Sequence, residues 1–299
     1  MLDIIKYRKF TFILSGIFVG VSLVLLIIFG LNLGIDFTGG SMMQLKFDER
    51  PSVDQIEKVL KPMNLGSLVV KPADEKSMIL KMEFIKEDTH QEILTKIRNE
   101  FETENNKVIE EKVNTIGPAI SSELKENSIY AAIGVILAII GYIAYAFRKV
   151  SKPVASWKYG LTAIFALVHD VMITMGVFAV LGYIMQVEVN IPFAVAMLTI
   201  LGYSVNDTIV VFDRIREKLN KLGVAKFKKS IIEGVNDTLV RSVNTSLTTL
   251  GVLFALLLFG GDSIFYFSLA LIIGIGLGTY SSIFLASPIL YTWKKVDAF

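Results

Sequence analysis

An aspartate stands in a stretch of the chain that is otherwise suited to the interior of a membrane. Residues 202–214 read GYSVNDTIVVFDR, and Asn206 and Asp207 lie within the almost wholly apolar segment 191–212. An ionisable side chain at the centre of a membrane helix costs about 2.5–3.5 kcal/mol on insertion scales, so such residues default to functional roles. The placement indicates a carboxylate that gains and loses a proton.

Arg241 supplies an opposite charge at a compatible depth. Asp207 lies roughly 9 Å inside the end of its segment, and Arg241 opens the next apolar stretch at the same end. Burial favours a neutral carboxyl group and a nearby arginine favours an ionised one, so such a pair could take up and release a proton. The residues expected to line it are Asn206, Thr208, Asn244, Thr245 and Ser246. The alternative is that the pair only holds helices together.

A second ionisable pair lies in LVHDVMIT, near the middle of segment 159–185. Asp170 is a candidate either for the same proton relay or for helix packing. Adjacent helical side chains point to different faces, so we expect no hydrogen bond between His169 and Asp170 and a packing role for His169. Asp170 and Asp207, on different segments, also leave an intramembrane aspartyl protease open.

The residues required by other catalytic sites are missing. The chain has two histidines, far apart, and no cysteine, which excludes an HExxH metalloprotease and thiolate metal sites. It contains neither a GxSxG elbow nor a GxxxxGK[ST] loop. We predict that the protein is not an enzyme, holds no metal or cofactor and binds no nucleic acid.

Composition places these residues in a membrane protein. Hydrophobic residues make up 53% of the 299 and charged residues 19%, with a mean hydropathy of +0.58. A membrane helix needs about 20 apolar residues. The segments that qualify are 10–31, 129–147, 159–185, 191–212, 243–260 and 264–291. GIDFTGG follows the first segment in place of a cleavage site, so we expect a retained anchor there.

Lysine and arginine predict the orientation. They cluster before the first span, in 148–158, in 214–241 and after the last span, whereas the short loops around Glu188 and Asp262 contain none. By the positive-inside rule both termini and the two basic loops are cytoplasmic, beside the lipid bilayer, and the long segment between the first and second spans is outside.

The long outside segment has the pattern of a small soluble domain. Its order β-α-β-β-α-β is typical of a ferredoxin-like fold. The expected strands are SMMQLKF, SLVV, SMILKMEF and VIEEKVN, and the expected helices are Ser52–Met63 and Thr89–Thr103. Capping boxes, Ser52 with Gln55 and Thr89 with Glu92, would start the two helices. We expect His90 to be an exposed surface residue.

The expected boundaries are 1–36 for the N-terminus and first span, 37–127 for the outside domain, and 128–299 for the remaining spans. In the junction GIDFTGG, Gly34, Gly39 and Gly40 permit either a hinge or a rigid connector, and Asp36 is expected to cap the turn.

Two further patterns concern packing. In the cytoplasmic segment 213–241, apolar residues recur every four positions from Phe227 to Leu239, which predicts an amphipathic helix lying on the membrane surface. Gly274 and Gly278 have the GxxxG spacing of closely packed helices, either within the chain or against a partner.

Five motifs, taken together and in order, resemble those of SecF proteins in the bacterial SecD/SecF protein-export family. They are GIDFTGG (34–40), VHD (168–170), GYSVNDTIVVFDRIRE (202–217), RSVNTSLTT (241–249) and GTYSSIFLASP (278–288). The resemblance covers nearly the whole chain. It implies an α-helical membrane protein of the resistance-nodulation-division class, with six transmembrane helices, half of a pseudo-symmetric unit, and an extracytoplasmic α+β ferredoxin-like domain between the first two.

The resemblance also implies a function. Family members work in the plasma membrane with SecD, the SecYEG channel and the SecA ATPase, and use the proton-motive force to promote preprotein translocation. The family's relay aspartate and arginine match Asp207 and Arg241, and Asp170 matches its HD signature as a candidate. Residue spacing alone does not identify the cargo, so a proton-coupled exporter of lipids or small molecules and a purely structural channel subunit remain alternatives.

Overall fold

Six helices form the membrane part of the chain, as predicted. The structure is a computed structural model that describes residues 1–146 and 154–296. Within these residues, six helices are long and apolar enough to span a membrane. They are α1 (Arg8–Phe29), α5 (Pro118–Ala146), α6 (Ser156–Met185), α7 (Ile191–Leu222), α8 (Phe227–Phe259), and α9 (Asp262–Ser281) continued by η3 (Ser282–Ala286) and α10 (Ser287–Val296). The chain divides into two compact units, Leu33–Ser128 and the rest.

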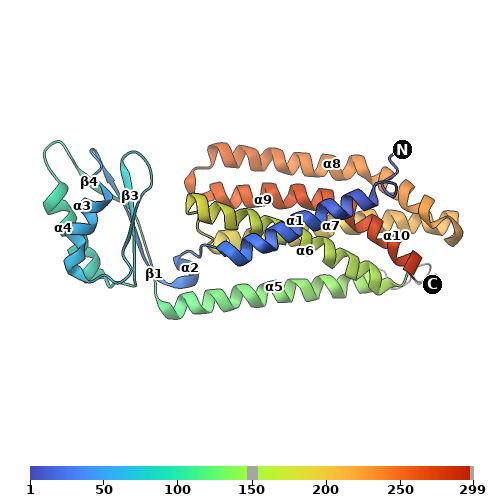
Figure 1. Ribbon diagram of the computed structural model, residues 1–299, viewed down its shortest axis with the longest axis horizontal. Helices are drawn as coiled ribbons and strands as arrows, with labels where there is room; N and C mark the ends of the chain where they lie inside the picture. Colours follow the sequence, from blue (N-terminus) through green and yellow to red (C-terminus); the bar gives the residue numbers. More distant parts are fainter. Residues whose placement is uncertain (147–153, 297–299) are drawn as a thin grey trace. The chain divides into compact units, whose positions relative to one another are not determined.

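The helical unit is built around α6, α7 and α9, with α1 packed on α6 and α8 packed on α7 and α9. Figure 1 shows the start of α1 and the end of α10 at the same end of this bundle. Glycine permits the closest crossings. A Cβ on Gly176 would lie 2.4 Å from Ser22, and one on Gly274 would lie 2.2 Å from Ile200. The GxxxG pair, Gly274 and Gly278, therefore packs α9 against α7 within the chain.

Segment 213–241 forms no separate helix on a membrane surface, and that prediction was wrong. Instead, α7 continues to Leu222 and α8 starts at Phe227, so the two helices form an antiparallel hairpin. The residues spaced by four do share a face, but it packs on α7: Phe227 and Ile231 are fully buried together with Ile215. The apolar periodicity predicted that this face is covered, and the cover is a neighbouring helix.

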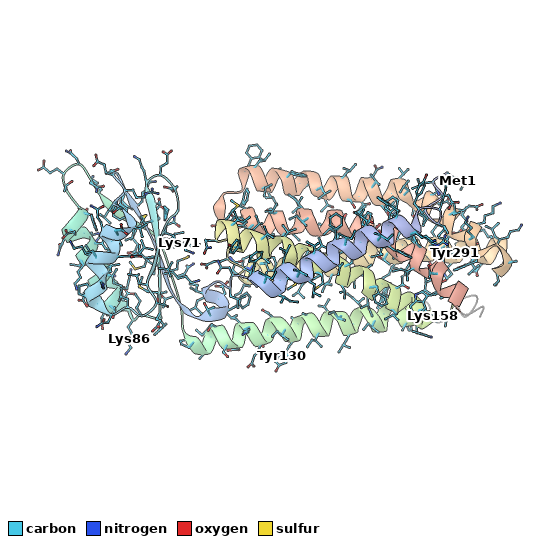
Figure 2. All side chains as sticks on the ribbon, viewed as in Figure 1. Met1, Lys71, Lys86, Tyr130, Lys158 and Tyr291 are labelled. Carbon is cyan, nitrogen blue, oxygen red and sulfur yellow. The ribbon has the colours of Figure 1, made fainter. Side chains whose placement is uncertain are left out.

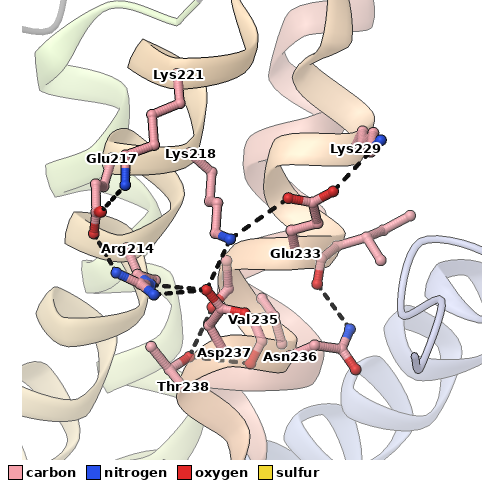
Figure 3. Close-up of polar contacts among 12 residues, drawn as sticks. Arg214, Glu217, Lys218, Lys221, Lys229, Glu233, Val235, Asn236, Asp237 and Thr238 are labelled. Carbon is pink, nitrogen blue, oxygen red and sulfur yellow. Dashed lines mark hydrogen bonds and ion pairs between the residues drawn. The ribbon is translucent and has the colours of Figure 1, made fainter.

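Ion pairs tie the two arms of the hairpin together (Figure 3). Asp237 on α8 accepts from Arg214 at 2.8 Å and from Lys218 at 2.9 Å, both on α7. Glu233 lies 3.5 Å from Lys218. Because these side chains are partly exposed, solvent screens each pair, and the buried apolar face remains the main stabilising contact.

The N-terminal residues form a strap over this hairpin. Ile4 and Ile5 are buried in the same apolar core. The Asn236 side chain accepts from the Leu2 amide at 2.8 Å and donates to the Leu2 carbonyl at 2.9 Å. Asp3 lies 3.3 Å from Lys228. The strap therefore fixes the start of α1 to α8.

Asn236→Ala should loosen the strap without unfolding the bundle. Each hydrogen bond contributes about 0.5–1.5 kcal/mol, so amide hydrogen exchange in residues 2–6 should accelerate on the order of tenfold. Asn220→Ala, at an exposed position near the end of α7, is the matched control. Unchanged exchange in Asn236→Ala would mean that Ile4 and Ile5 hold the strap alone.

Aromatic and basic side chains gather at the end of the bundle where the chain starts. Lys158 lies 5.5 Å from the ring centre of Trp157 and 5.2 Å from that of Trp293. Arg8 lies over Tyr291 at 5.5 Å. Figure 2 shows Met1, Lys158 and Tyr291 at this end. Tryptophan, tyrosine and snorkelling cations are typical of a membrane–water interface.

The second unit has the predicted ferredoxin-like order, with all strands antiparallel in the order β2-β3-β1-β4. Its elements are α2 (Ile35–Thr38), β1 (Gly40–Phe47), α3 (Val53–Leu60), η1 (Lys61–Met63), β2 (Val69–Pro72), β3 (Ser77–Met82), α4 (Glu87–Phe101) and β4 (Val108–Ile116). Alternate strand residues such as Met43 and Leu80 face Ile56 of α3 and Ile93 of α4 in one apolar core. The sheet thus buries one face beneath its two helices.

One capping prediction was correct and one was wrong. Ser52 and Gln55 form the expected reciprocal box at the start of α3. In contrast, α4 begins at Glu87, two residues before Thr89, and its N-cap residue Lys86 makes no side-chain cap. Glu87 and Asp88 in the first turn interact favourably with the helix dipole, which supports the earlier start.

His90 is buried, contrary to the prediction of an exposed residue. It is 8% exposed and lies 3.0 Å from Glu87 and 3.2 Å from Glu110 of β4. A hydrogen bond from Gln91, and then one from His90, hold the pKa of Glu87 below its usual range. His90 therefore connects the start of α4 to the edge of the sheet.

Two glycines of the GIDFTGG junction have backbone conformations that favour glycine. Gly39 and Gly40 have φ of +73° and +123°, a region that residues with a side chain rarely adopt. A Cβ on Gly40 would lie 2.7 Å from the Met82 carbonyl oxygen. Gly34 has an ordinary φ of −73°, and Asp36 lies in the first turn of α2. Because the fold itself requires Gly39 and Gly40, replacing them with bulky residues cannot test a hinge.

Candidate functional site

Asp207 is held by two serines from other elements of the bundle. Ser242 of α8 donates a hydrogen bond to Oδ1, and Ser282, the first residue of η3, donates one to Oδ2. The side chain is therefore partly buried between α7, α8 and η3. Hydrogen bonds to a carboxylate oxygen stabilise its ionised form. In the part of the chain that the structure describes, two hydroxyl donors and no basic side chain hold the carboxylate oxygens.

A small polar cavity of about 40 Å³ adjoins Asp207. Its lining residues are Tyr203, Asn206, Asp207, Val210, Arg241 and Thr245. A cavity of this size, with several polar groups, has room for a water molecule. A larger hollow of about 540 Å³ lies between α5, α7 and α8 and shares Val210 and Arg241 with the small cavity. Asp207 thus lies next to space from which a proton carrier could reach it.

Arg241 lies beside the same small cavity as Asp207, and among the described residues 1–146 and 154–296 the two form no direct ion pair. The arginine side chain is exposed and lines both cavities. The carboxylate oxygens of Asp207 instead accept hydrogen bonds from Ser242 and Ser282. Asp207 and Arg241 therefore share the lining of the small cavity.

The predicted polar lining is only partly present. Asn206 and Thr245 line the small cavity. Thr208 is buried and donates at 3.0 Å to the Ser204 carbonyl of its own helix. Ser246 contacts the Thr279 hydroxyl, and the remaining predicted residue, Asn244, is exposed. Tyr203 also lines the cavity, and no feature of its sequence position marks it as a lining residue.

Asp170 occupies a second polar site in the core. It is completely buried and accepts from Ser204 of α7 at 2.6 Å and from Ser281 of α9 at 2.8 Å. Contrary to the sequence prediction, His169 Nδ1 also lies 2.8 Å from Asp170 Oδ1. Adjacent residues on a helix are about 100° apart, and here both side chains turn toward α7 and α9 because their partners lie there.

Two consecutive serines, at the junction of α9 and η3, hydrogen-bond the carboxylates of Asp170 and Asp207. Ser281 donates to Asp170 and Ser282 to Asp207, and η3, which starts at Ser282, is a π-helical turn. Single π turns within helices are rare and are found frequently at functional sites. Neither the π turn nor the serine partners could be selected from sequence, although Ser281 and Ser282 stand out as small polar residues in an apolar span.

The site does not have the composition of a metal centre. Across the described residues, no three His, Cys, Asp or Glu side chains gather closely enough to hold a metal ion. Asp170 and Asp207 are each bound by separate serines. The bound serines give no support to the alternative of an aspartyl protease, in which two carboxyl groups activate one water molecule.

Comparisons with protein families and known proteins agree with this architecture. Residues 96–296 match the family model described as protein export membrane protein SecD/SecF, C-terminal, and residues 24–49 match the SecD/SecF GG motif. The chain is 38% identical to the protein translocase subunit SecF of Thermobaculum terrenum, over 99% of this chain and 95% of that protein. It is 41% identical to SecF of Sebaldella termitidis, over 98% and 92%.

A solved structure shares the fold. The crystal structure of SecDF from Thermus thermophilus, a translocon-associated membrane protein, matches with a TM-score of 0.83 and 31% identity. The match covers 98% of this chain and 39% of that chain, so this chain spans about two fifths of the larger protein. With the family models and the full-length relatives, this shows that the chain belongs to the SecD/SecF family of protein-export membrane proteins, in its SecF branch.

Proposed function

We propose that this protein works with a SecD partner in the bacterial plasma membrane and uses the proton-motive force to promote preprotein translocation. Asp207 carries the proton, and Arg241 tunes its release. The observation that supports this most directly is the carboxylate of Asp207, held by two serine hydroxyls beside a water-sized polar cavity. Each proton that crosses a potential of 100 mV releases about 2.3 kcal/mol, enough to shift a conformational equilibrium severalfold.

The coupling step is a change in hydrogen bonding. Proton uptake at Asp207 removes the charge that the Ser242 and Ser282 hydroxyls stabilise, so α8 and η3 are held less firmly to α7. Arg241, across the cavity, favours the ionised carboxylate and so promotes proton release. The resulting change in helix packing moves the outer domain through the GIDFTGG junction.

The sequence and the bundle support one orientation. The end that carries the strap, Lys158 and Arg8 is cytoplasmic, because basic and aromatic residues concentrate there. Both termini then lie in the cytoplasm, and Leu33–Ser128 forms the extracytoplasmic domain. SecYEG and SecA are the expected partners in translocation, with the preprotein as cargo.

The SecD partner has a suitable surface on α7 and α8. Gly202 and Asn206 on α7, and Asn244 and Thr248 on α8, are exposed in the helical unit. The amide side chains of Asn206 and Asn244, if they faced lipid, would lack hydrogen-bond partners, whereas a second helix can satisfy them. Covering this face would also enclose the cavity beside Asp207.

Proton flux in sealed vesicles that contain the chain with SecD tests the proposal. With a gradient and a translocating preprotein present, Asp207→Asn should reduce flux close to background while assembly with SecD persists. Asp213→Asn is the matched control, because this exposed carboxylate lies six residues later on α7 and pairs with Arg216. Wild-type flux in Asp207→Asn would refute the proton role and support a purely structural channel subunit. Gradient-driven export of a lipid or small molecule without SecD would instead support the exporter alternative.

A further inference from the structure

The His169–Asp170 pair is a buried imidazole and carboxylate that lies outside the proposed relay through Asp207 and Arg241. Both side chains are buried in the middle of α6, with 3% and 0% exposure. Asp170 already accepts from Ser204 and Ser281 through Oδ2, and its Oδ1 lies 2.8 Å from His169 Nδ1. When Asp170 is ionised, its carboxylate only accepts hydrogen bonds, and Nδ1 of the imidazole then carries the proton that it donates.

This tautomer leaves Nε2 as a bare acceptor in the core. In the part of the chain that the structure describes, His169 Nε2 is buried without a hydrogen-bond partner. Buried polar atoms are rarely left unpaired, and those that are deserve a functional explanation. A neutral imidazole with a donor bond to a carboxylate on one side and a free lone pair on the other can accept a proton, because the carboxylate stabilises the imidazolium that forms.

We infer that His169 binds a proton at Nε2, with Asp170 as its counter-charge, and so forms a second proton-binding site in the bundle beside Asp207. This inference rests on the proposed proton-coupled function. When the proton binds, both imidazole nitrogens carry a proton and the pair becomes a buried ion pair. When it leaves, the pair returns to a neutral imidazole beside an ionised Asp170. No other reactant is needed.

The neighbours of the pair provide no competing charge. From α9, the Tyr280 ring stacks with the imidazole, with ring centres 6.0 Å apart, and the Tyr280 hydroxyl contacts Ser15 of α1 at 3.2 Å. From α7, Ser204 reaches Asp170. Among the described contacts of the imidazole and its carboxylate, the titratable groups are therefore Asp170 and Tyr280, and a tyrosine is neutral at physiological pH.

The two proton sites are mechanically linked. Ser281, bound to Asp170, precedes Ser282, which is bound to Asp207. Ser204 and Asp207 lie one turn apart on α7. A change of charge at either carboxylate therefore changes the strength of hydrogen bonds that involve the same two elements, α7 and the start of η3.

Nitrogen NMR of the imidazole rings tests proton binding directly. The full-length chain, carrying ¹⁵N-labelled histidine, is combined with unlabelled SecD in lipid bilayers. With two histidines in the chain, His90→Gln assigns the remaining signals to His169. We expect one protonated and one bare nitrogen near pH 8, and two protonated nitrogens as the pH falls to about 5. In Asp170→Asn the doubly protonated form should disappear from this range. A bare Nε2 at every pH would overturn the inference.

A functional comparison separates this inference from the proposed function. His169→Gln retains an N–H donor for Asp170 but cannot bind the proton, and His90→Gln is the control in the outer domain. We expect His169→Gln to assemble with SecD, to lose proton flux toward the level of Asp207→Asn, and to lose its pH dependence between about pH 5 and 8. Wild-type flux and pH profile in His169→Gln, when Asp207→Asn is inactive, would overturn this inference and leave the proposed function standing. If Asp207→Asn keeps full flux, the proposed function fails, and the NMR titration still decides whether His169 binds a proton.

Discussion

Replacing both Ser242 and Ser282 with alanine is expected to abolish proton-coupled transport while the six helices remain folded. Each hydroxyl donates to one oxygen of Asp207. A hydrogen bond to a charged group contributes about 1.5–3 kcal/mol, so losing both shifts the balance between ionised and protonated carboxyl by roughly a hundredfold or more. Asp207 would then retain its proton, and release would limit every cycle.

Proton flux in vesicles containing SecD measures this effect. Ser268→Ala is the matched control, because Ser268 is also buried on α9 and its hydroxyl has no partner among the described residues. Each single variant should give an intermediate flux, and a double-mutant cycle tests whether the two hydroxyls act on one group. Flux near the wild-type level in Ser242→Ala/Ser282→Ala would show that hydrogen bonding to Asp207 does not control proton release.

Gly274→Leu is expected to prevent stable packing of the helical unit. Even the Cβ would lie 2.2 Å from Ile200 Cδ1 and 2.9 Å from its Cγ2. Isoleucine is branched at Cβ and has few rotamers in a helix, so it cannot turn away. Overpacking in a close-packed interior costs about 1–3 kcal/mol and occasionally more. Because α9 packs on α7 here, the change would also displace Ser204, Ser281 and Ser282 from the two carboxylates.

Thermal unfolding of the purified chain in detergent is the measurement. Gly276→Leu is the control on the same helix, since a Cβ there meets nothing within 4 Å. Ile200→Ala should partly restore stability to a Gly274→Ala variant, because it removes the atoms that clash. Equal stability of Gly274→Leu and Gly276→Leu would contradict close packing of α9 on α7.

The number and order of the spans could be predicted because each requires only a local run of apolar residues. The same holds for the strands of the outer domain, where alternate residues such as Met43 and Leu45 face the core. Ser52 and Gln55 lie three residues apart, so their capping box is also a local property. These features need no knowledge of which elements lie side by side.

The errors arise where a distant partner decides the outcome. His90 is buried because Glu110 of β4 lies beside it. The apolar face that starts at Phe227 indicates a cover, but periodicity does not distinguish a membrane surface from helix α7. Asp207 could be selected because a carboxylate in an apolar segment is rare. Its partners Ser242 and Ser282 could not, because serines are common in membrane helices and only the rotation of α8 and η3 brings these two to Asp207.

The π-helical turn Ser282–Ala286 gives this part of the gene a place where the length of a span can change by one residue. A π turn is an α-helix that contains one extra residue locally. Deleting that residue would return the segment to α-helical geometry, and the later side chains would keep their faces. Leu290 of α10, now completely buried, would then stay in the core. A single-residue deletion elsewhere in the span would instead rotate each later side chain by about 100°. A change of length within the turn therefore disturbs mainly Ser281 and Ser282 and, with them, the contacts to the two carboxylates.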